Sequence, residues 1–295
     1  MNITILGPGA IGSLWAVKLS KAGHSVSLWS RSTSPSTLLS LDEEQAIAFN
    51  NNNIQNLEAA DLVLVTVKAW QVESAIAPLL KNIHPDAILV FMHNGMGALD
   101  SIEHSLADRP VVIATTTQAA FKPSSDNVNH TGMGQTQLGS FNAKGSQCQF
   151  LVNVFNHALP EVVWNSKIQT ALWTKLAINC AINPLTGLNQ VKNGELANQE
   201  YSGQLSAVIR ELVQVMNAEH IQCDYQQLHS SIYNVINTTS ANNSSMKQDI
   251  HFQRPTEIEF ITGYLIKIAT KHSISVPVNT ALYNQIKQQE QNWLD

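Results

Sequence analysis

The stretch NITILGPGAIGSLWAVKLS, residues 2–20, decides the fold class of this chain. Its start, Ile3–Leu6, is an apolar run typical of a buried strand, and the apolar residues within 11–19 recur with helical spacing. Between them GPGAIG, residues 7–12, fits the GxGxxG pattern directly after a strand and at the start of a helix. This context predicts a dinucleotide-binding turn.

Each glycine of this turn has a physical reason in such a fold. Gly7 permits the tight turn, Gly9 lets the backbone approach a pyrophosphate, and Gly12 allows close packing of helix on strand. The helix N-terminus faces the negative charge. The alternative is a glycine-rich turn without a ligand. The predicted cofactor loop consists of Gly7, Pro8, Gly9, Ala10, Ile11 and Gly12.

Outward from this unit, the apolar runs Ser25–Trp29, Leu62–Val67 and Ala87–Met92 alternate with helical patterns. Such alternation predicts a parallel sheet with helices on both faces. FNNNNIQN (49–56) has little to bury and is interpreted as a loop, and 121–150 as short strands and turns that close the sheet. The sequence thus predicts an α/β Rossmann-type N-terminal domain.

From about residue 165 the pattern becomes helical. Apolar residues between 205 and 216 follow helical spacing, and those between 258 and 268 repeat it. We therefore predict a Rossmann domain over 1–164, which binds the cofactor, and an all-α substrate and catalytic domain over 165–295.

Composition excludes several classes of function. The net charge is −5, and Lys and Arg form no cluster that would follow a nucleic-acid backbone. Three widely spaced cysteines indicate neither disulfides nor a metal site. The start of the chain has no leader pattern, and no apolar run approaches the roughly 18 residues that span a bilayer. We expect a cytoplasmic protein without nucleic-acid or membrane partners.

Several polar residues follow the predicted strands. Arg31 stands where NAD-preferring proteins of this fold carry an acid, and a guanidinium pairs with a 2′-phosphate, so NADPH is favoured. The alternative is a solvated surface arginine. Lys68 and Gln71 follow the third strand and Asn94 the fourth, at the edge where open α/β sheets bind ligands.

A polar stripe marks the helical domain. In WTKLAINCAINPL (173–185), Lys175, Asn179 and Asn183 recur every fourth residue in an otherwise apolar segment. This spacing aligns them on one helix face, which we expect to line a cleft or a polar ligand. The alternative is a lysine and two amides satisfied within the core. Pro184 is expected to end or kink the helix.

Three further polar residues have both a structural and a functional explanation. Asn193 lies in an NG turn. Ser245 with Gln248 fits a capping box, and the same helix N-terminus could hold a carboxylate. Glu257 is expected in the first turn of another helix, where the helix dipole is reason enough for an acid.

These segments together resemble the ketopantoate reductase (2-dehydropantoate 2-reductase) family over nearly the whole chain. The glycine loop, VKAWQV, HNGMG, the lysine-asparagine helix, NGEL, SSMKQDI and TEIEFI occur in the family's order. The resemblance implies a C-terminal helical bundle like that of 6-phosphogluconate dehydrogenase. It also implies NADPH-dependent reduction of ketopantoate to pantoate, in pantothenate biosynthesis.

The resemblance also assigns roles to residues. It makes Lys175 the general acid and Glu257 a partner of substrate or cofactor at the reacting centre. It makes Arg31 and Lys68 contacts of the NADPH phosphate end and places Ala120 beside the nicotinamide. The substrate-binding residues that it implies are Asn94, Lys175, Asn179, Asn183, Asn193 and Ser245.

Some alternatives stay open. The substrate could be another small 2-keto acid, because fold and cofactor do not fix what is reduced. A non-catalytic NADPH-sensing protein would keep the nucleotide loop. The sequence decides neither between monomer and homodimer nor which contacts residues 32–57 make.

Overall fold

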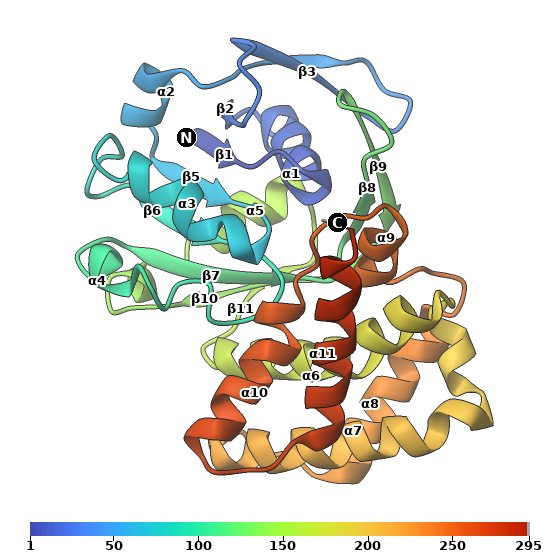
Figure 1. The fold of residues 1–295 in the computed structure, drawn as a ribbon. Helices are drawn as coiled ribbons and strands as arrows, with labels where there is room; N and C mark the ends of the chain where they lie inside the picture. The colour runs from blue at the N-terminus through green and yellow to red at the C-terminus, as the bar shows by residue number, and fades with distance from the viewer. Residues whose placement is uncertain (294–295) are drawn as a thin grey trace. The chain divides into compact units, whose positions relative to one another are not determined.

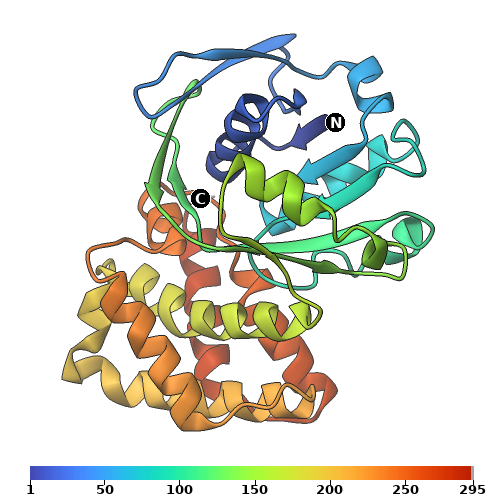
Figure 2. The same cartoon turned by 180° about the vertical axis from the view of Figure 1, so that it is seen from behind.

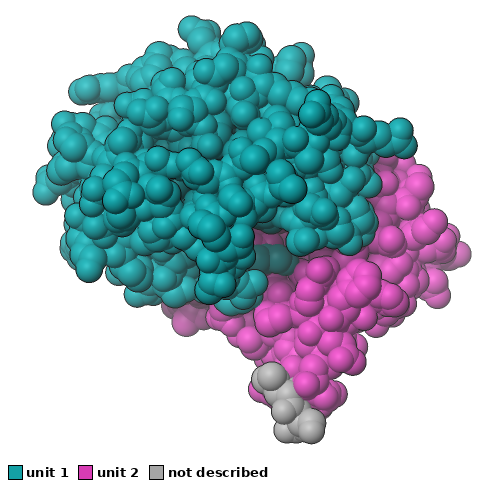
Figure 3. Space-filling view, turned by 90° about the horizontal axis from the view of Figure 1, so that it is seen from above, with its two compact units in different colours: residues 1–93, 98–168 teal, residues 94–97, 169–295 magenta. Residues whose placement is uncertain are grey.

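A computed structural model describes residues 1–293 of the 295-residue chain. The chain divides into two compact units, coloured separately in Figure 3. Unit 1 comprises 1–93 and 98–168, and unit 2 comprises 94–97 and 169–295. The short segment 94–97 thus groups with the C-terminal part, although it follows a strand of the N-terminal one.

Unit 1 is built on a seven-stranded sheet with the order β11-β10-β7-β6-β5-β1-β2 (Figure 1). Its neighbouring strands pair in parallel, except that β10 runs antiparallel to β7. This arrangement confirms the predicted Rossmann-type sheet. The strands are β1 (Asn2–Leu6), β2 (Ser25–Trp29), β5 (Leu62–Val65), β6 (Ile88–Phe91), β7 (Val111–Thr116), β10 (Thr136–Ser140) and β11 (Val162–Trp164).

The central strands are apolar on both faces. All four residues of β5, LVLV, and of β6, ILVF, are buried. A strand that is buried on both faces has a continuous run of apolar residues instead of an alternating pattern. Such runs made both strands predictable from the sequence.

Helix α1 (Ala10–Lys21) contributes much of the core of unit 1. Seven of its twelve residues are buried, including Trp15, whose ring contacts Phe155 edge to face at 5.0 Å between centroids. Phe155 belongs to α5 (Leu151–Ala158), which runs beside α1 in Figures 1 and 2. The glycine loop therefore leads into a helix that is fixed by packing.

A second, four-stranded sheet was not predicted. Its order is β4-β3-β9-β8, with β3 Ser36–Leu41, β4 Ile47–Asn50, β8 Ala119–Phe121 and β9 Asn127–Gly132. The segment 121–150 therefore closes the large sheet only through β10. The loop predicted over 49–56 is also wrong in part, because β4 ends at Asn50 and α2 (Ile54–Glu58) begins within it.

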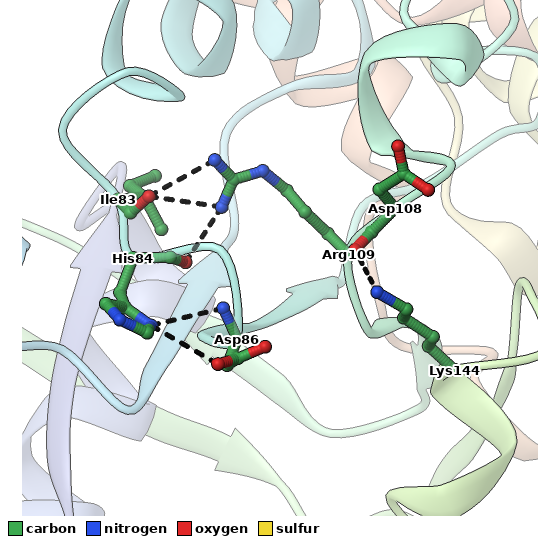
Figure 4. A network of polar contacts seen from close by, with 6 residues as sticks. All are labelled: Ile83, His84, Asp86, Asp108, Arg109 and Lys144. Atoms are coloured by element: carbon green, nitrogen blue, oxygen red, sulfur yellow. Dashed lines mark hydrogen bonds and ion pairs between the residues drawn. The ribbon is translucent and has the colours of Figure 1, made fainter.

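One arginine organises the turns at an edge of unit 1 (Figure 4). The guanidinium of Arg109 donates to the backbone oxygens of Leu80 at 2.7 Å and His84 at 2.8 Å, and also to Ile83. Burial lowers the pKa of Arg109. The other short helices of unit 1 are α3 (Val72–Ile76), α4 (Glu103–Leu106), η1 (Ala69–Gln71), η2 (Ala77–Leu79) and η3 (Gly145–Gln147).

Unit 2 is helical, as predicted. Its helices α7 and α8 are amphipathic, and their apolar faces are buried. None of the helices in residues 1–293 is long and apolar enough to cross a membrane. The elements of unit 2 are α6 (Ile168–Asn189), which starts at the last residue of unit 1, η4 (Asn193–Ala197), α7 (Gln199–Ala218), α8 (Tyr225–Thr238), α9 (Ser245–His251), η5 (Ile258–Phe260), α10 (Thr262–Lys271) and α11 (Pro277–Gln291).

A buried carboxylate fixes the start of α11. Glu211, on α7, is 8% exposed and accepts the backbone N–H groups of Val278 and Asn279, each at 2.9 Å. It also accepts the side-chain amide of Asn279 at 2.7 Å. These amides belong to the first turn of α11, where N–H groups lack intrahelical acceptors. Glu211 therefore joins two helices of unit 2.

Candidate active site

The glycine loop has the geometry that a dinucleotide requires. Gly7 has φ +86°, and a Cβ there would lie 2.3 Å from Val67 Cγ1. A Cβ on Gly12 would lie 2.3 Å from Thr66 Oγ1. A Cβ on Gly9, in contrast, would meet no atom within 4 Å. Packing therefore explains the first and third glycines, whereas the open space at Gly9 leaves room for a diphosphate against the backbone.

Helix α1 begins within this loop, at Ala10. Its first amides, from Ala10 to Gly12, have no acceptor within the helix. Such a helix start favours an anion, because aligned N–H groups and the helix dipole both point to it. On the other side, Thr66 Oγ1 donates to Gly7 O at 2.7 Å and holds the turn on the sheet. The loop thus fits the diphosphate of a nicotinamide dinucleotide.

Arg31 is exposed and lies two residues beyond the end of β2. The loop that carries it is held by the asparagine-rich segment. Asn52 Oδ1 accepts the Ser30 N–H at 2.9 Å, and the buried Asn51 donates to Ser34 O at 2.8 Å. The sequence analysis missed this function of the asparagines; the signal was a run of side chains that readily bond backbone groups.

Lys68 and Gln71 lie at the short helix η1 that follows β5. Gln71 Oε1 accepts the Lys68 N–H at 3.3 Å, and the Gln71 N–H donates to Lys68 O at 2.8 Å. The Gln71 side chain thus has a local structural task. Both residues are partly buried, and both belong to unit 1.

Ala120 lies in β8 opposite His130, next to an irregularity in strand register. The residue that fixes the preceding loop is Gln118, which is 5% exposed. Its Oε1 accepts from His130 Nε2 at 2.8 Å and from the Gly134 N–H at 3.0 Å. Sequence reasoning did not identify Gln118 as the support of this segment.

The predicted polar stripe lies on one helix of unit 2. Lys175, Asn179 and Asn183 all belong to α6, and Asn183 is 6% exposed. Of the two effects expected of Pro184, an end or a kink, the end is wrong, because α6 continues to Asn189. Proline removes one backbone donor, yet packing on neighbouring helices holds the remaining turns. The stripe is therefore backed by a continuous helix.

The ammonium of Lys175 has an altered acidity. Burial lowers its pKa from 10.5 to about 8, and the nearby carboxylate of Glu257 raises it, acting against burial. Glu257 is 5% exposed and accepts from Asn94 Nδ2 at 3.2 Å. Three residues far apart in sequence thus form one polar group in unit 2.

Glu257 does not lie in the first turn of an α-helix, as the sequence suggested. It precedes the short helix η5, and α10 begins only at Thr262. The dipole of a long helix therefore does not account for a buried acid here. Its hydrogen bond with Asn94 and its electrostatic interaction with Lys175 offer a functional reason instead.

The loop that carries Asn94 is docked on unit 2 by its backbone. Gly95 has φ +78°, and a Cβ there would lie 2.4 Å from Phe260 O. The Met96 N–H donates to the same oxygen at 2.8 Å. Glycine is required at this close approach, which explains the first glycine of the NGMG pattern. The docking orients Asn94 toward Glu257.

The far end of α6 packs against the start of α9. Here the capping prediction is wrong by one residue: Ser244, not Ser245, caps α9 and accepts the Lys247 N–H at 3.0 Å. Ser244 Oγ also bonds Thr186 Oγ1 at 2.7 Å. Because Ser244 satisfies the cap, the exposed Ser245 has its hydroxyl available for a ligand. Neither Thr186 nor Ser244 was identified from the sequence.

Asn193 begins the short helix η4, rather than a simple turn. Its N–H donates to Asn242 O at 3.1 Å and its side-chain amide to Thr239 Oγ1 at 2.9 Å. Its Oδ1 is buried and meets no hydrogen-bond donor within residues 1–293. A buried acceptor without a partner is costly, and a ligand hydroxyl would satisfy it.

The candidate residues thus form two sets. The glycine loop, Arg31, Lys68, Gln71 and Ala120 lie in unit 1, and Asn94, Lys175, Asn179, Asn183, Asn193, Ser245 and Glu257 lie in unit 2. The first set suits a dinucleotide phosphate. The second combines one ammonium with amides and hydroxyls, as binding and protonating a small polar carbonyl compound requires.

Two family models match this chain in consecutive parts. Residues 3–143 match the family model described as Ketopantoate reductase PanE/ApbA, and residues 167–290 match Ketopantoate reductase PanE/ApbA C terminal. The chain is 54% identical over 293 residues to the 2-dehydropantoate 2-reductase of Vibrio cholerae, covering 99% of both chains.

Solved structures show the same fold. A PanE/ApbA family ketopantoate reductase from Ralstonia eutropha matches with a TM-score of 0.89 and 25% identity, covering 100% of both chains. A D-mandelate dehydrogenase solved with NADH matches with a TM-score of 0.90 at 21% identity, also over 100% of both chains, which supports the fold alone. The chain therefore belongs to the ketopantoate reductase family of nicotinamide-dependent oxidoreductases.

Proposed function

We propose that this chain reduces 2-dehydropantoate to pantoate with NADPH, a step of pantothenate biosynthesis. The observation that carries the proposal is the Lys175 ammonium, whose pKa of about 8 suits proton donation near neutral pH. It is held beside Glu257 on a helix of a ketopantoate reductase family member. NADPH, when bound, supplies the hydride.

Lys175 acts as the general acid. Negative charge develops on the carbonyl oxygen as the ketone is reduced, and a positioned ammonium both stabilises that charge and delivers the proton. Glu257 keeps the ammonium charged at neutral pH by opposing the effect of burial on its pKa. Asn94 holds the Glu257 carboxylate by its amide at 3.2 Å.

The remaining polar residues of unit 2 bind the substrate. Asn179 and Asn183 follow Lys175 on α6 and offer amide donors for the carboxylate. Ser245 adds a hydroxyl, and the buried Asn193 Oδ1 accepts from the substrate hydroxyl. Together these groups recognise a hydroxylated keto acid with only one fixed positive charge.

NADPH rather than NADH is our proposal for the cofactor. Arg31 is exposed just beyond β2, where its guanidinium can pair with a 2′-phosphate. Lys68 adds positive charge, and Ala120 lies beside the nicotinamide, as the family resemblance implies. Gln71 and Asn94, which follow strands at the ligand-binding edge of the sheet, complete the proposed cofactor contacts. The free cysteines fit the reducing conditions of the cytoplasm, where we place the reaction.

The test is oxidation of NADPH, followed by its absorbance, with and without 2-dehydropantoate. We expect substrate-dependent turnover, and a loss of roughly 10²-fold or more in kcat for Lys175→Ala. Lys167→Ala is the matched control, because Lys167 is exposed and lies directly before the same helix. Equal turnover of the Lys175 variant and the wild type would remove Lys175 from the mechanism.

The substrate is tested separately. 3,3-Dimethyl-2-oxobutanoate differs from 2-dehydropantoate only in lacking the hydroxyl that Asn193 is proposed to bind, so its kcat/KM should be well below that of 2-dehydropantoate. Similar values for both would favour a broader 2-keto acid reductase. Binding of NADPH without oxidation by any 2-keto acid would instead support the non-catalytic alternative.

A further inference from the structure

A lysine that the assigned site does not use reaches the glycine loop from another part of unit 1. Lys122 directly follows β8, more than 100 residues from the loop in sequence. Its Nζ donates to Pro8 O at 2.8 Å and to Ser13 Oγ at 3.0 Å. Pro8 lies between the first two glycines of GPGAIG. The ammonium thus bonds the loop itself.

Ser13 links this ammonium to helix α1. Its hydroxyl accepts from Lys122 and donates to Pro8 O at 3.0 Å, and its N–H donates to Gly9 O at 2.9 Å. Ser13 is fully buried, so the network has a rigid base. Pro8 O therefore accepts two hydrogen bonds, one from a charged group, and these fix the orientation of the Pro8–Gly9 peptide.

The position of the charge has a second effect. Lys122 is partly buried, and burial lowers the pKa of its ammonium, whereas Asp126 raises it. A cation at this depth is screened less than one in water. Its field adds to that of the amides at the start of α1, because Nζ lies 2.8 Å from Pro8 O in the same loop.

We propose that Lys122 is a positioning residue for the cofactor diphosphate: it fixes the glycine loop through Pro8 and Ser13 and supplies positive charge beside it. This inference rests on the proposed use of a nicotinamide dinucleotide by the same loop. The diphosphate is common to NADPH and NADH, so Lys122 supports both equally. Arg31, in contrast, is proposed to act only on the 2′-phosphate.

The experiment compares dissociation constants, measured by fluorescence titration of NADPH and NADH. Lys122→Met should raise both by about tenfold, which corresponds to about 1.4 kcal/mol, because the loop loses its two hydrogen bonds to Lys122 and the positive charge beside it. Their ratio should stay unchanged, whereas Arg31→Asp should weaken NADPH alone. Lys144→Met is the control, because Lys144 Nζ also bonds a backbone oxygen of unit 1, that of Asp108 at 2.6 Å.

A second variant separates charge from architecture. Lys122→Gln keeps a donor for Pro8 O without the charge, so the dependence of its dissociation constant on salt should be flatter than in the wild type. With saturating NADPH, kcat should stay near the wild-type value while KM for NADPH rises. Thermal unfolding of each variant shows whether titrations are made on folded protein.

Two results would overturn the inference. One is unchanged affinity for both dinucleotides in folded Lys122→Met and Lys122→Gln. The other is a loss confined to NADPH, which would move Lys122 to the 2′-phosphate. If the wild-type chain itself bound neither dinucleotide, the proposed function would fail, and that outcome is distinguished by the wild-type titration alone.

Discussion

The acidity of Lys175 gives the sharpest test of the proposed chemistry. Burial, opposed in part by the charge of Glu257, lowers its pKa from 10.5 to about 8, a net cost of roughly 3 kcal/mol for the charged form. A general acid must be protonated, so kcat/KM for the keto acid should be flat below about pH 8 and fall about tenfold per pH unit above it. At pH 9 roughly a tenth of Lys175 remains charged.

Replacing Glu257 by glutamine removes the charge that opposes this effect. Glu257 raises the pKa of Lys175, so its loss should move the basic limb of the profile to lower pH. A close opposite charge typically shifts a pKa by about one unit or more. We therefore expect the limb of Glu257→Gln to begin about one pH unit earlier. The glutamine keeps an oxygen that can accept from Asn94, so the loop geometry is retained.

The assay is the pH profile of kcat/KM for the wild type and Glu257→Gln. It runs from about pH 6 to about pH 10, roughly two units on each side of the Lys175 pKa of about 8. Glu259→Gln is the matched control, because Glu259 is exposed and bonded to Tyr283 at 2.6 Å. Glu259→Gln also removes one negative charge, but at a position two residues along the chain from Glu257. A basic limb at the same pH in wild type and Glu257→Gln would refute the coupling of the two groups.

Three other predictions concern stability and reactivity. Glu211→Ala should lower the free energy of unfolding by about 2 to 3 kcal/mol in chemical denaturation, because it leaves the amides at the start of α11 without their acceptor. The hydrogen bond from His272 is the main cause of the lowered pKa of Glu219, so this contact stabilises the fold above the ordinary pKa of 4.5. The stabilisation is lost as the pH falls from 4.5 through the lowered pKa of Glu219. Over that pH range the melting temperature of His272→Ala should therefore fall less than that of the wild type. Burial raises the pKa of Cys180 to about 12, so a thiol reagent should label the partly exposed Cys223 first in the native protein; rapid labelling of Cys180 would contradict this.

The parts of the fold that the sequence predicted depend on local patterns. The apolar runs of β5 and β6 and the spacing of GPGAIG are each contained in a few consecutive residues. The second sheet was missed because its strands are only three to six residues long, and β3 pairs with β9 across more than 80 residues of sequence. Such non-local pairing leaves little trace in a single sequence.

Some candidate residues could be predicted from a local pattern, whereas others are brought to the site only by the tertiary structure. The stripe of Lys175 and its asparagines is visible because a polar group every fourth residue is conspicuous in an apolar helix. Lys122 stands in an ordinary polar loop, and only the tertiary structure brings it to Pro8. Ser244 was passed over for its neighbour because both residues fit a helix cap by type, and only the backbone decides which one serves.

The docking of residues 94–97 on unit 2 limits how this chain can be divided. A gene fragment ending at residue 164 would encode β6 and the loop after it but lose Phe260, so the Met96 amide would have no acceptor and Asn94 no carboxylate. The reverse fragment would lack the loop altogether. Neither half carries all of its own structure, so domain exchange between relatives should transfer this tetrapeptide together with the C-terminal helices.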